Sequence, residues 1–248
     1  MFRNFAFHFG RYLDLLGDAL SRPERLNVYW RETLRQMDDI GIGSLIIVAI
    51  IAVFMGAVAA VQFAYQLDGQ LVPSYYIGYI VRDLAIIESA PTITCLVLAG
   101  KVGSNMASEI GGMRQKEHID AMEIMGVNTS AFLILPKVIA AMVMIPLLVA
   151  IAAAVAILGG YLAVVVPETI SSAAYIKGLQ SFFVPYNVFI MFVKAFIFAF
   201  LLTTVSCYMG YYVEGGSVEL GQASTQAVVV SDILILLADF VIAVVLTG

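Results

Sequence analysis

The sequence predicts an all-α integral membrane protein with about five transmembrane helices, N-terminal interfacial helices and a helix in a cytoplasmic loop. Hydrophobic residues make up 61% of the 248 residues and charged residues only 12%, and the mean hydropathy is +0.95. A soluble core of this length needs less apolar side chain, and a soluble surface uses more charge. We therefore expect one helical membrane domain without a second soluble domain.

Apolar runs long enough to cross a bilayer occur five times. A hydrocarbon core of about 30 Å requires roughly 20 apolar residues per helix. Suitable runs lie near 42–66, 86–107, 131–165, 187–212 and 226–246. The third run is longer than necessary and contains Pro136 and Pro146, so we expect it to be kinked or tilted. Residues 41–248 are predicted to form the transmembrane domain.

The first forty residues have an amphipathic pattern. Phe5, Phe9 and Tyr12 recur at three- and four-residue spacing, with Arg11 and Asp14 among the charged residues between them. These charges interrupt any apolar region of a cleavable signal peptide. Residues 1–40 are therefore predicted to form interfacial helices in the headgroup region. A soluble helical cap on the cytoplasmic face is the alternative.

The distribution of Lys and Arg predicts the orientation. Two of the thirteen, Arg82 and Lys177, lie on one side of the membrane, and Lys194 lies inside a span. The other ten precede the first span or lie between the second and third: Arg3, Arg11, Arg22, Arg25, Arg31, Arg35, Lys101, Arg114, Lys116 and Lys137. By the positive-inside rule, the N-terminus is cytoplasmic and the C-terminus lies outside.

The polar insert between the second and third spans is predicted to contain a short helix over 115–125. Ile119, Met122 and Met125 form an apolar stripe among charged residues, Gly126 can end the helix, and Asn128 can cap the next one. Such a helix could transmit force from an ATPase, although the pattern alone favours an ordinary polar loop. The sequence has no GxxxxGK[ST] motif, so an ATPase would be a separate chain.

The segment from Glu88 to Pro136 carries a family resemblance. It reads ESAPTITCLVLAGKVGSNMASEIGGMRQKEHIDAMEIMGVNTSAFLILP and is similar to the signature of the MlaE/YrbE family of lipid-transporting ABC permeases. In that signature an acidic residue and a proline precede LxAGxxGS and then ExGxMRxxEQIDAxExMGVxP. The matching residues are Glu88, Pro91, Ala99, Gly100, Gly103, Ser104, Glu109, Gly111, Met113, Arg114, Glu117, Ile119, Asp120, Ala121, Glu123, Met125, Gly126 and Val127. Weaker similarity extends over most of residues 35–246.

The resemblance implies a permease subunit, not an enzyme, that forms a homodimer in the bacterial inner membrane with its C-terminus in the periplasm. The implied partners are ABC ATPase subunits that bind ATP and Mg, an MCE-domain protein, a small STAS-type regulatory subunit and phospholipid. No nucleic acid partner and no metal or cofactor in this chain are expected. The residues that the resemblance assigns to contact with the ATPase are Glu109, Met113, Arg114, Glu117, Ile119, Asp120, Met122, Glu123 and Met125.

A lipid site is predicted at the outer end of the first span. Small and apolar side chains leave room there, and the matching stretch lines the lipid cavity in the family. The predicted residues are Ala60, Ala64, Tyr65, Leu67 and Leu71. The competing explanation is that this end of the span only packs against the second and fifth spans.

Charged residues inside spans form a second candidate site. They cost roughly 2.5–3.5 kcal/mol on insertion scales and are functional candidates by default. Lys194 is predicted to pair with Glu88 or Asp239, either as a static clamp or as part of the transport cycle. The family commonly has Arg where this chain has Ile87, and Arg82, about one turn earlier, is a candidate substitute.

Two other classes of function remain open at this stage. An ion- or proton-coupled secondary transporter of an apolar substrate could use the same charges, but usually shows repeated halves. An intramembrane lipid-modifying enzyme would need a nucleophile or a metal cluster. Neither His8 nor His118 lies in a span with suitable partners, so the enzyme is the weakest of these hypotheses.

Overall fold

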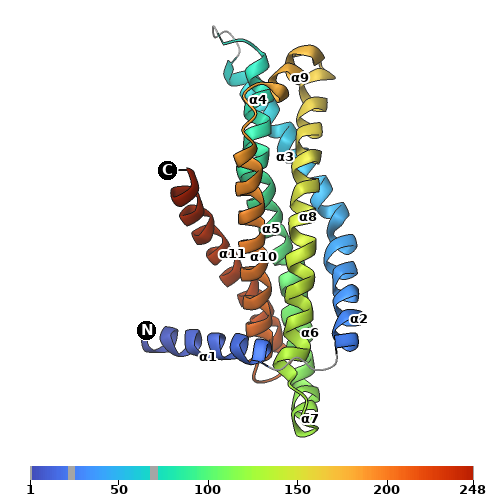
Figure 1. The fold of residues 1–248 in the computed structure, drawn as a ribbon, viewed down its shortest axis with the longest axis vertical. Helices are drawn as coiled ribbons and strands as arrows, with labels where there is room; N and C mark the ends of the chain where they lie inside the picture. Colours follow the sequence, from blue (N-terminus) through green and yellow to red (C-terminus); the bar gives the residue numbers. More distant parts are fainter. Residues whose placement is uncertain (1, 22–25, 68–71, 248) are drawn as a thin grey trace. The chain divides into compact units, whose positions relative to one another are not determined.

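The computed structural model describes residues 2–21, 26–67 and 72–247, and these are almost entirely helical (Figure 1). The α-helices are α1 (Phe2–Ser21), α2 (Leu26–Met37), α3 (Gly43–Leu67), α4 (Tyr75–Leu84), α5 (Thr94–Leu98), α6 (Ser104–Gln115), α7 (His118–Ile124), α8 (Thr129–Val165), α9 (Ser172–Gln180), α10 (Pro185–Tyr211) and α11 (Ser217–Thr247). π-helical segments connect some of them: η1 (Asp38–Ile42), η2 (Ala85–Ile93) and η3 (Ala99–Gly103).

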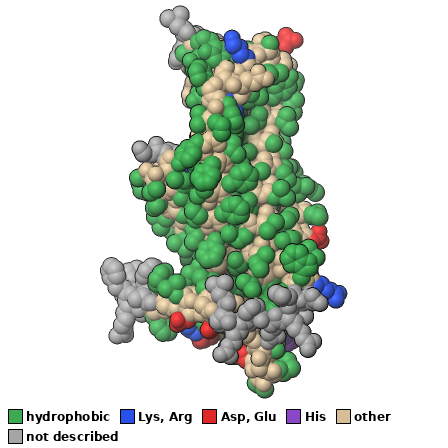
Figure 2. Space-filling view, in the orientation of Figure 1, with side chains coloured by type: hydrophobic (Ala, Val, Ile, Leu, Met, Phe, Trp, Pro, Cys, Tyr) green, Lys and Arg blue, Asp and Glu red, His purple; other side chains and the backbone are tan. Residues whose placement is uncertain are grey.

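Five helical stretches in the described part of the chain are long and apolar enough to cross a membrane. They are Tyr29–Leu67, Tyr75–Gln115, Thr129–Val165, Pro185–Tyr211 and Ser217–Leu246. Hydrophobic side chains cover most of the surface visible in Figure 2. The prediction of an all-α membrane protein with about five spans is thus confirmed.

The second stretch is longer than the apolar run near 86–107 that marked it in the sequence. It begins at Tyr75 and continues through η2, α5, η3 and α6 to Gln115. The apolar run ends near charged residues such as Asp83, but the helix continues through them, and Asp83 forms an ion pair with Arg82 at 2.8 Å. Pro91 lies inside η2, and a proline removes one backbone donor and clashes with the preceding turn. The wider π-helical turn around Pro91 accommodates that defect.

The chain divides into two compact units, and the first comprises residues 1–40, 98–144 and 198–238. Its core includes Ile110, Ile119 and Ile134, together with Leu15 and Ala19 from α1. Hydrogen bonds fix α1 further, because Tyr12 Oη lies 2.7 Å from Thr204 Oγ1 and Asn128 Nδ2 donates to the carbonyl of Asp18. Burial raises the pKa of Tyr12, so this phenol stays neutral. Helix α1 is therefore an integral part of this unit.

The second unit comprises residues 41–97, 145–197 and 239–248. It contains α9, which we did not predict from the sequence. The N-terminal signal of α9 is Ser171, whose hydroxyl accepts a hydrogen bond from the Ala174 amide. Helix α9 packs closely on α4, because Gly178 lies against the backbone of Tyr75 and Gly78. Tyr175 is fully buried in this unit's core, and its phenol donates to the Ile157 carbonyl.

Close packing of α3 on α8 gives a testable prediction. A Cβ atom built on Gly56 would overlap the carbonyl group of Ala156, so the helices approach as closely as a glycine permits. We expect Gly56→Ala to destabilise the protein by about 1–3 kcal/mol, the usual cost of overpacking. A lowered thermal unfolding temperature in detergent would be the measurement.

Gly112→Ala is the matched control for this substitution. A Cβ atom at Gly112 meets no atom within 4 Å, and alanine favours the helix of α6. The control should unfold at the wild-type temperature or slightly above it. A Gly56→Ala protein as stable as the control would contradict the packing seen here.

Candidate functional site

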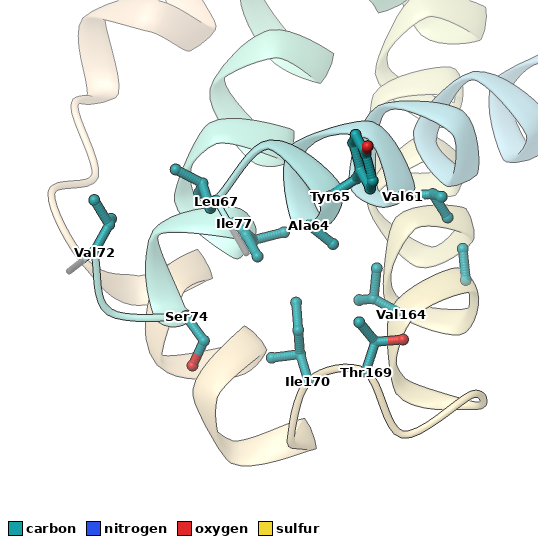
Figure 3. A pocket seen from close by; sticks show the side chains of 11 residues that line it. Val61, Ala64, Tyr65, Leu67, Val72, Ser74, Ile77, Val164, Thr169 and Ile170 are labelled. Atoms are coloured by element: carbon teal, nitrogen blue, oxygen red, sulfur yellow. The ribbon is translucent and has the colours of Figure 1, made fainter. Parts of the chain in front are cut away.

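A cavity of about 480 Å³ lies in the second unit at the C-terminal end of α3 (Figure 3). Its lining comes from the ends of α3 and α8, the start of α4 and the turn before α9. The lining residues are Val61, Ala64, Tyr65, Leu67, Val72, Ser74, Ile77, Ala163, Val164, Thr169 and Ile170. Apolar side chains dominate this lining, and the hydroxyls of Ser74 and Thr169 add polar groups.

The structure brings together three of the five residues predicted to contact lipid. Ala64, Tyr65 and Leu67 line the cavity, and Tyr65 is 83% exposed. Ala60 instead lies fully buried in the core of the second unit, where Ile77 and Val164 also pack. For Ala60 the structure supports helix packing. The described residues that cluster with it come from the second and third spans and from the segment around α9, whereas the competing explanation named the second and fifth spans. Leu71 lies outside the described residues.

The cavity is of the size and chemistry that suit an apolar ligand with a polar end. Binding pockets for small molecules usually have volumes of about 300–1,000 Å³ and combine an apolar lining with a few polar groups. Ser74 and Thr169 can donate or accept hydrogen bonds, while Leu67, Ile77 and Ile170 offer only apolar contact. The sequence did not reveal the contribution of Thr169 and Ile170, because the turn that carries them resembles any inter-helix loop.

A buried ammonium group lies between two carboxylates in the same unit. Lys194 is fully buried in α10, and its Nζ lies 2.9 Å from Glu88 Oε2 and 2.6 Å from Asp239 Oδ1. The pair with Glu88 is a hydrogen bond, whereas the contact with Asp239 Oδ1 is an ion pair without hydrogen-bond alignment. Thr92 donates to the other oxygen of Asp239 at 3.2 Å. The three charges that the sequence singled out therefore meet at one point.

The π-helical segment η2 carries both Glu88 and Thr92 toward this cluster. Pro91 lies between them, and irregular π turns of this kind are frequent at functional sites. Glu88 keeps about half of its side chain exposed, whereas Asp239 is almost buried. The ammonium group itself is fully buried, and of its two carboxylate partners only Glu88 is substantially exposed.

Arg82 does not take the place of the arginine that Ile87 replaces. Its guanidinium is buried, pairs with Asp83 and donates to the carbonyls of Leu179 at 2.6 Å, Ser181 at 2.9 Å and Phe182 at 3.2 Å. Our suggestion that Arg82 substitutes beside Glu88 is therefore wrong. Its physical role is to satisfy the carbonyls at the end of α9, which have no partners within that helix.

The polar insert of the first unit forms two short helices with a sharp turn between them. Helix α6 ends at Gln115, and Glu117 has φ 59°, which ends one helix before α7 begins at His118. The helix predicted over 115–125 is thus shorter, because a non-glycine residue in the left-handed region interrupts it. Gly126 has φ 80°, and Asn128 Oδ1 accepts a hydrogen bond from the Ala131 amide. The predicted helix end and helix cap are confirmed.

The apolar residues in and next to α7 face in two directions. Ile119 is fully buried in the core of the first unit, and Met113 and Met122 pack against that core. Ile124 and Met125 are 88% and 72% exposed. Ile119, which the resemblance assigns to contact with the ATPase, is therefore too buried to touch a partner in this structure. Met125, which is assigned to the same contact, is exposed, and Ile124, which is not, is exposed next to it.

Two acidic residues of the insert, Asp120 and Glu123, are engaged within the first unit. Arg114 Nη1 lies 2.8 Å from Asp120 Oδ1 and 3.9 Å from Glu123 Oε1. Glu123 also accepts hydrogen bonds from Tyr211 and Thr129. These contacts hold α7 against the ends of α8 and α10, so it projects as a braced element and not as a free loop (Figure 1).

Glu109 and Glu117 complete the set of predicted partner contacts. Glu109 forms an ion pair with Lys137, whose own side chain is buried. Glu117 is exposed at the turn between α6 and α7. Glu117 thus lies at the projecting turn itself, whereas Glu109, Asp120 and Glu123 form contacts within the first unit.

Comparisons with known proteins identify the family. The family model described as Permease MlaE matches residues 33–245. A probable ABC transporter permease protein of Rickettsia bellii is 36% identical over 224 residues, covering 90% of this chain and 86% of the relative. The intermembrane phospholipid transport system permease protein MlaE of Haemophilus influenzae is 28% identical over 236 residues, or 94% of this chain and 89% of the relative. A probable permease of Synechocystis is 32% identical over 85% of this chain and 80% of its own length. The chain therefore belongs to the MlaE permease family and is a multi-pass ABC transporter permease.

Proposed function

We propose that the chain moves phospholipid between the inner and outer membranes as the permease of an ABC transporter whose ATPase is a separate chain. The observation that carries this proposal is the cavity at the end of α3, which combines an apolar lining with the hydroxyls of Ser74 and Thr169. The name of the Haemophilus influenzae relative, an intermembrane phospholipid transport system permease, supports the same cargo.

The proposed assembly is a homodimer with ATPase subunits that bind ATP and Mg, an MCE-domain protein and a small STAS-type subunit. It lies in the inner membrane, with the N-terminus in the cytoplasm and the C-terminus in the periplasm, as the distribution of Lys and Arg favours. In this arrangement α7 contacts the ATPase, and the cavity opens toward the outer side. The ion cluster around Lys194 supports two alternatives: a static clamp, or a group whose pairing changes during the cycle.

A photo-crosslinking experiment tests the cavity as a lipid site. A photoreactive amino acid at Leu67, in the cavity lining, should capture phospholipid in cells, and the adduct mass identifies the lipid. Acyl chains held in a concave apolar site stay in contact with the reactive group longer than lipids that diffuse past a flat surface.

Ile47 serves as the control position because it lies on the same helix, is exposed and does not line the cavity. Labelling there should be several-fold weaker than at Leu67 if the cavity retains lipid. Equal labelling at both positions would indicate ordinary surrounding lipid and would remove the cavity as a transport site.

A further inference from the structure

A second cavity, of about 340 Å³, lies in the first unit and has no role in the function proposed above. It is lined by residues of α1, the end of α10, the turn after it and the start of α11. Two of its walls carry opposite charge. Arg11 and His8 contribute from α1, whereas Glu214 and Glu219 contribute from the turn and from α11.

Arg11 has no carboxylate partner among the described residues. Its guanidinium carbon lies 4.0 Å from the centre of the Tyr212 ring and 5.5 Å from that of Phe7. Stacking on aromatic rings holds the planar group in place, while the N–H groups at its edge remain able to donate. His8 is held nearby, with Nδ1 2.8 Å from Tyr208 Oη. A fixed guanidinium edge of this kind suits a phosphate group.

The part of the lining that comes from α11 and the turn before it provides negative charge and amides. Glu219 Oε2 accepts a hydrogen bond from the Gly216 amide, which fixes the carboxylate at the beginning of α11. Glu214, Gln222 and Gln226 also line the cavity. A ligand with only negative charge would be repelled by the two carboxylates. A zwitterion that carries a phosphate and an ammonium group can satisfy both walls.

The position of α1 points to a lipid as the source of that zwitterion. Phe7, Phe9 and Leu13 are exposed on this amphipathic helix, as in helices that lie at the level of lipid headgroups. A headgroup could enter the cavity from that level while its acyl chains remain among the apolar side chains outside.

We propose that this cavity binds the headgroup of a phospholipid with a primary amine, such as phosphatidylethanolamine. The phosphodiester contacts Arg11, with His8 beside it, and the ammonium group contacts Glu214 and Glu219. This site is separate from the cavity at the end of α3 and does not depend on the proposed transport function.

Lipid retention by the full-length protein tests the proposal. The protein is extracted from bilayers of equal parts phosphatidylethanolamine, phosphatidylglycerol and phosphatidylcholine, and native mass spectrometry counts the lipids that remain bound. Wild type should retain phosphatidylethanolamine over the other two lipids. Arg11→Gln should reduce this retention about tenfold, as expected for the loss of one charge-assisted contact. Glu214→Gln should shift retention toward phosphatidylglycerol.

The matched control is Arg35→Gln, which removes an exposed arginine from α2 that pairs weakly with Glu32. It should retain lipid like the wild type. Equal loss in both arginine variants, or equal retention of all three lipids by wild type, would overturn the proposal. Release of the lipid by millimolar inorganic phosphate would also overturn it, because the site would then bind a free anion.

A second measurement locates the bound lipid, and it keeps the proposal testable even if Arg11→Gln folds poorly. A photoreactive amino acid at Gln222, in the cavity wall, should form an adduct with the mass of phosphatidylethanolamine. Arg11→Lys, which keeps the charge but loses the planar edge, should weaken that adduct. An unchanged adduct in Arg11→Lys, or no adduct in wild type, would contradict the assignment.

Discussion

Replacing Lys194 with methionine is expected to reduce both the amount of folded protein and any lipid transfer more than other single substitutions in α10. Methionine has a similar length but no charge, so Glu88 and Asp239 would face each other without the ammonium group. Removing one partner of a buried pair typically costs about 3–5 kcal/mol, because an uncompensated charge stays behind. Fluorescence-detected size-exclusion chromatography and thermal unfolding in detergent would measure the loss.

Phe196→Ala is the control for Lys194→Met. Phe196 lies two residues away on α10 and is 43% exposed, so its truncation removes apolar surface without leaving a charge unpaired. We expect a loss of no more than about 1–2 kcal/mol there, since the side chain is far from fully buried. Similar unfolding temperatures for the two variants would mean that the cluster contributes little to the fold.

A triple variant separates the two roles left open for this cluster. Glu88→Gln and Asp239→Asn, added to Lys194→Met, remove all three charges together. The loss in Lys194→Met comes from uncompensated carboxylates, and the triple variant leaves no such charge, so the folded yield should recover at least in part. Recovery of lipid transfer as well would indicate a static clamp. A stable triple variant that does not transfer lipid would indicate that the charges act during transport.

Much of the fold follows from hydrophobicity alone. Five long apolar runs correspond to five helical stretches, because a bilayer allows few other ways to satisfy the backbone. The cost of a charge in hydrocarbon likewise made Lys194, Glu88 and Asp239 predictable partners. The short helix α9 was not predicted. Its ends depend on the Ser171 cap and on the contacts of Arg82 with its last carbonyls, which link residues almost a hundred positions apart.

The orientation of α7 shows a different limit of sequence reasoning. Helical spacing places Ile119 and Met122 on one side, but it does not say whether that side meets the protein or a partner. The structure turns Ile119 into the core of the first unit because Glu117 adopts a left-handed conformation and redirects the helix. A sequence pattern contains little signal for a non-glycine residue with positive φ. The exposed face of α7 could therefore be assigned only from the structure.

This assignment changes the best test of contact with the proposed ATPase. A charge reversal at Asp120 would also break its ion pair with Arg114, so a loss of function could reflect damage to the insert itself. Ile124 and Met125 are largely exposed and offer a cleaner choice. Large apolar side chains on a projecting, braced helix are the kind of residue that anchors a protein interface.

The double variant Ile124→Asp, Met125→Asp is expected to fold like the wild type but to lose its ATPase partner. Burying two new carboxylates in an interface should cost at least about 2 kcal/mol, or roughly thirtyfold in affinity. Co-purification of the ATPase and its lipid-stimulated hydrolysis would measure this, with Ile124→Leu, Met125→Leu as the control that keeps the apolar surface. Because both side chains are exposed, the unfolding temperature of the aspartate variant should stay unchanged. If that variant retains the ATPase at the wild-type level and still transfers lipid, then α7 is not the docking element and the insert serves only to join α6 to α8.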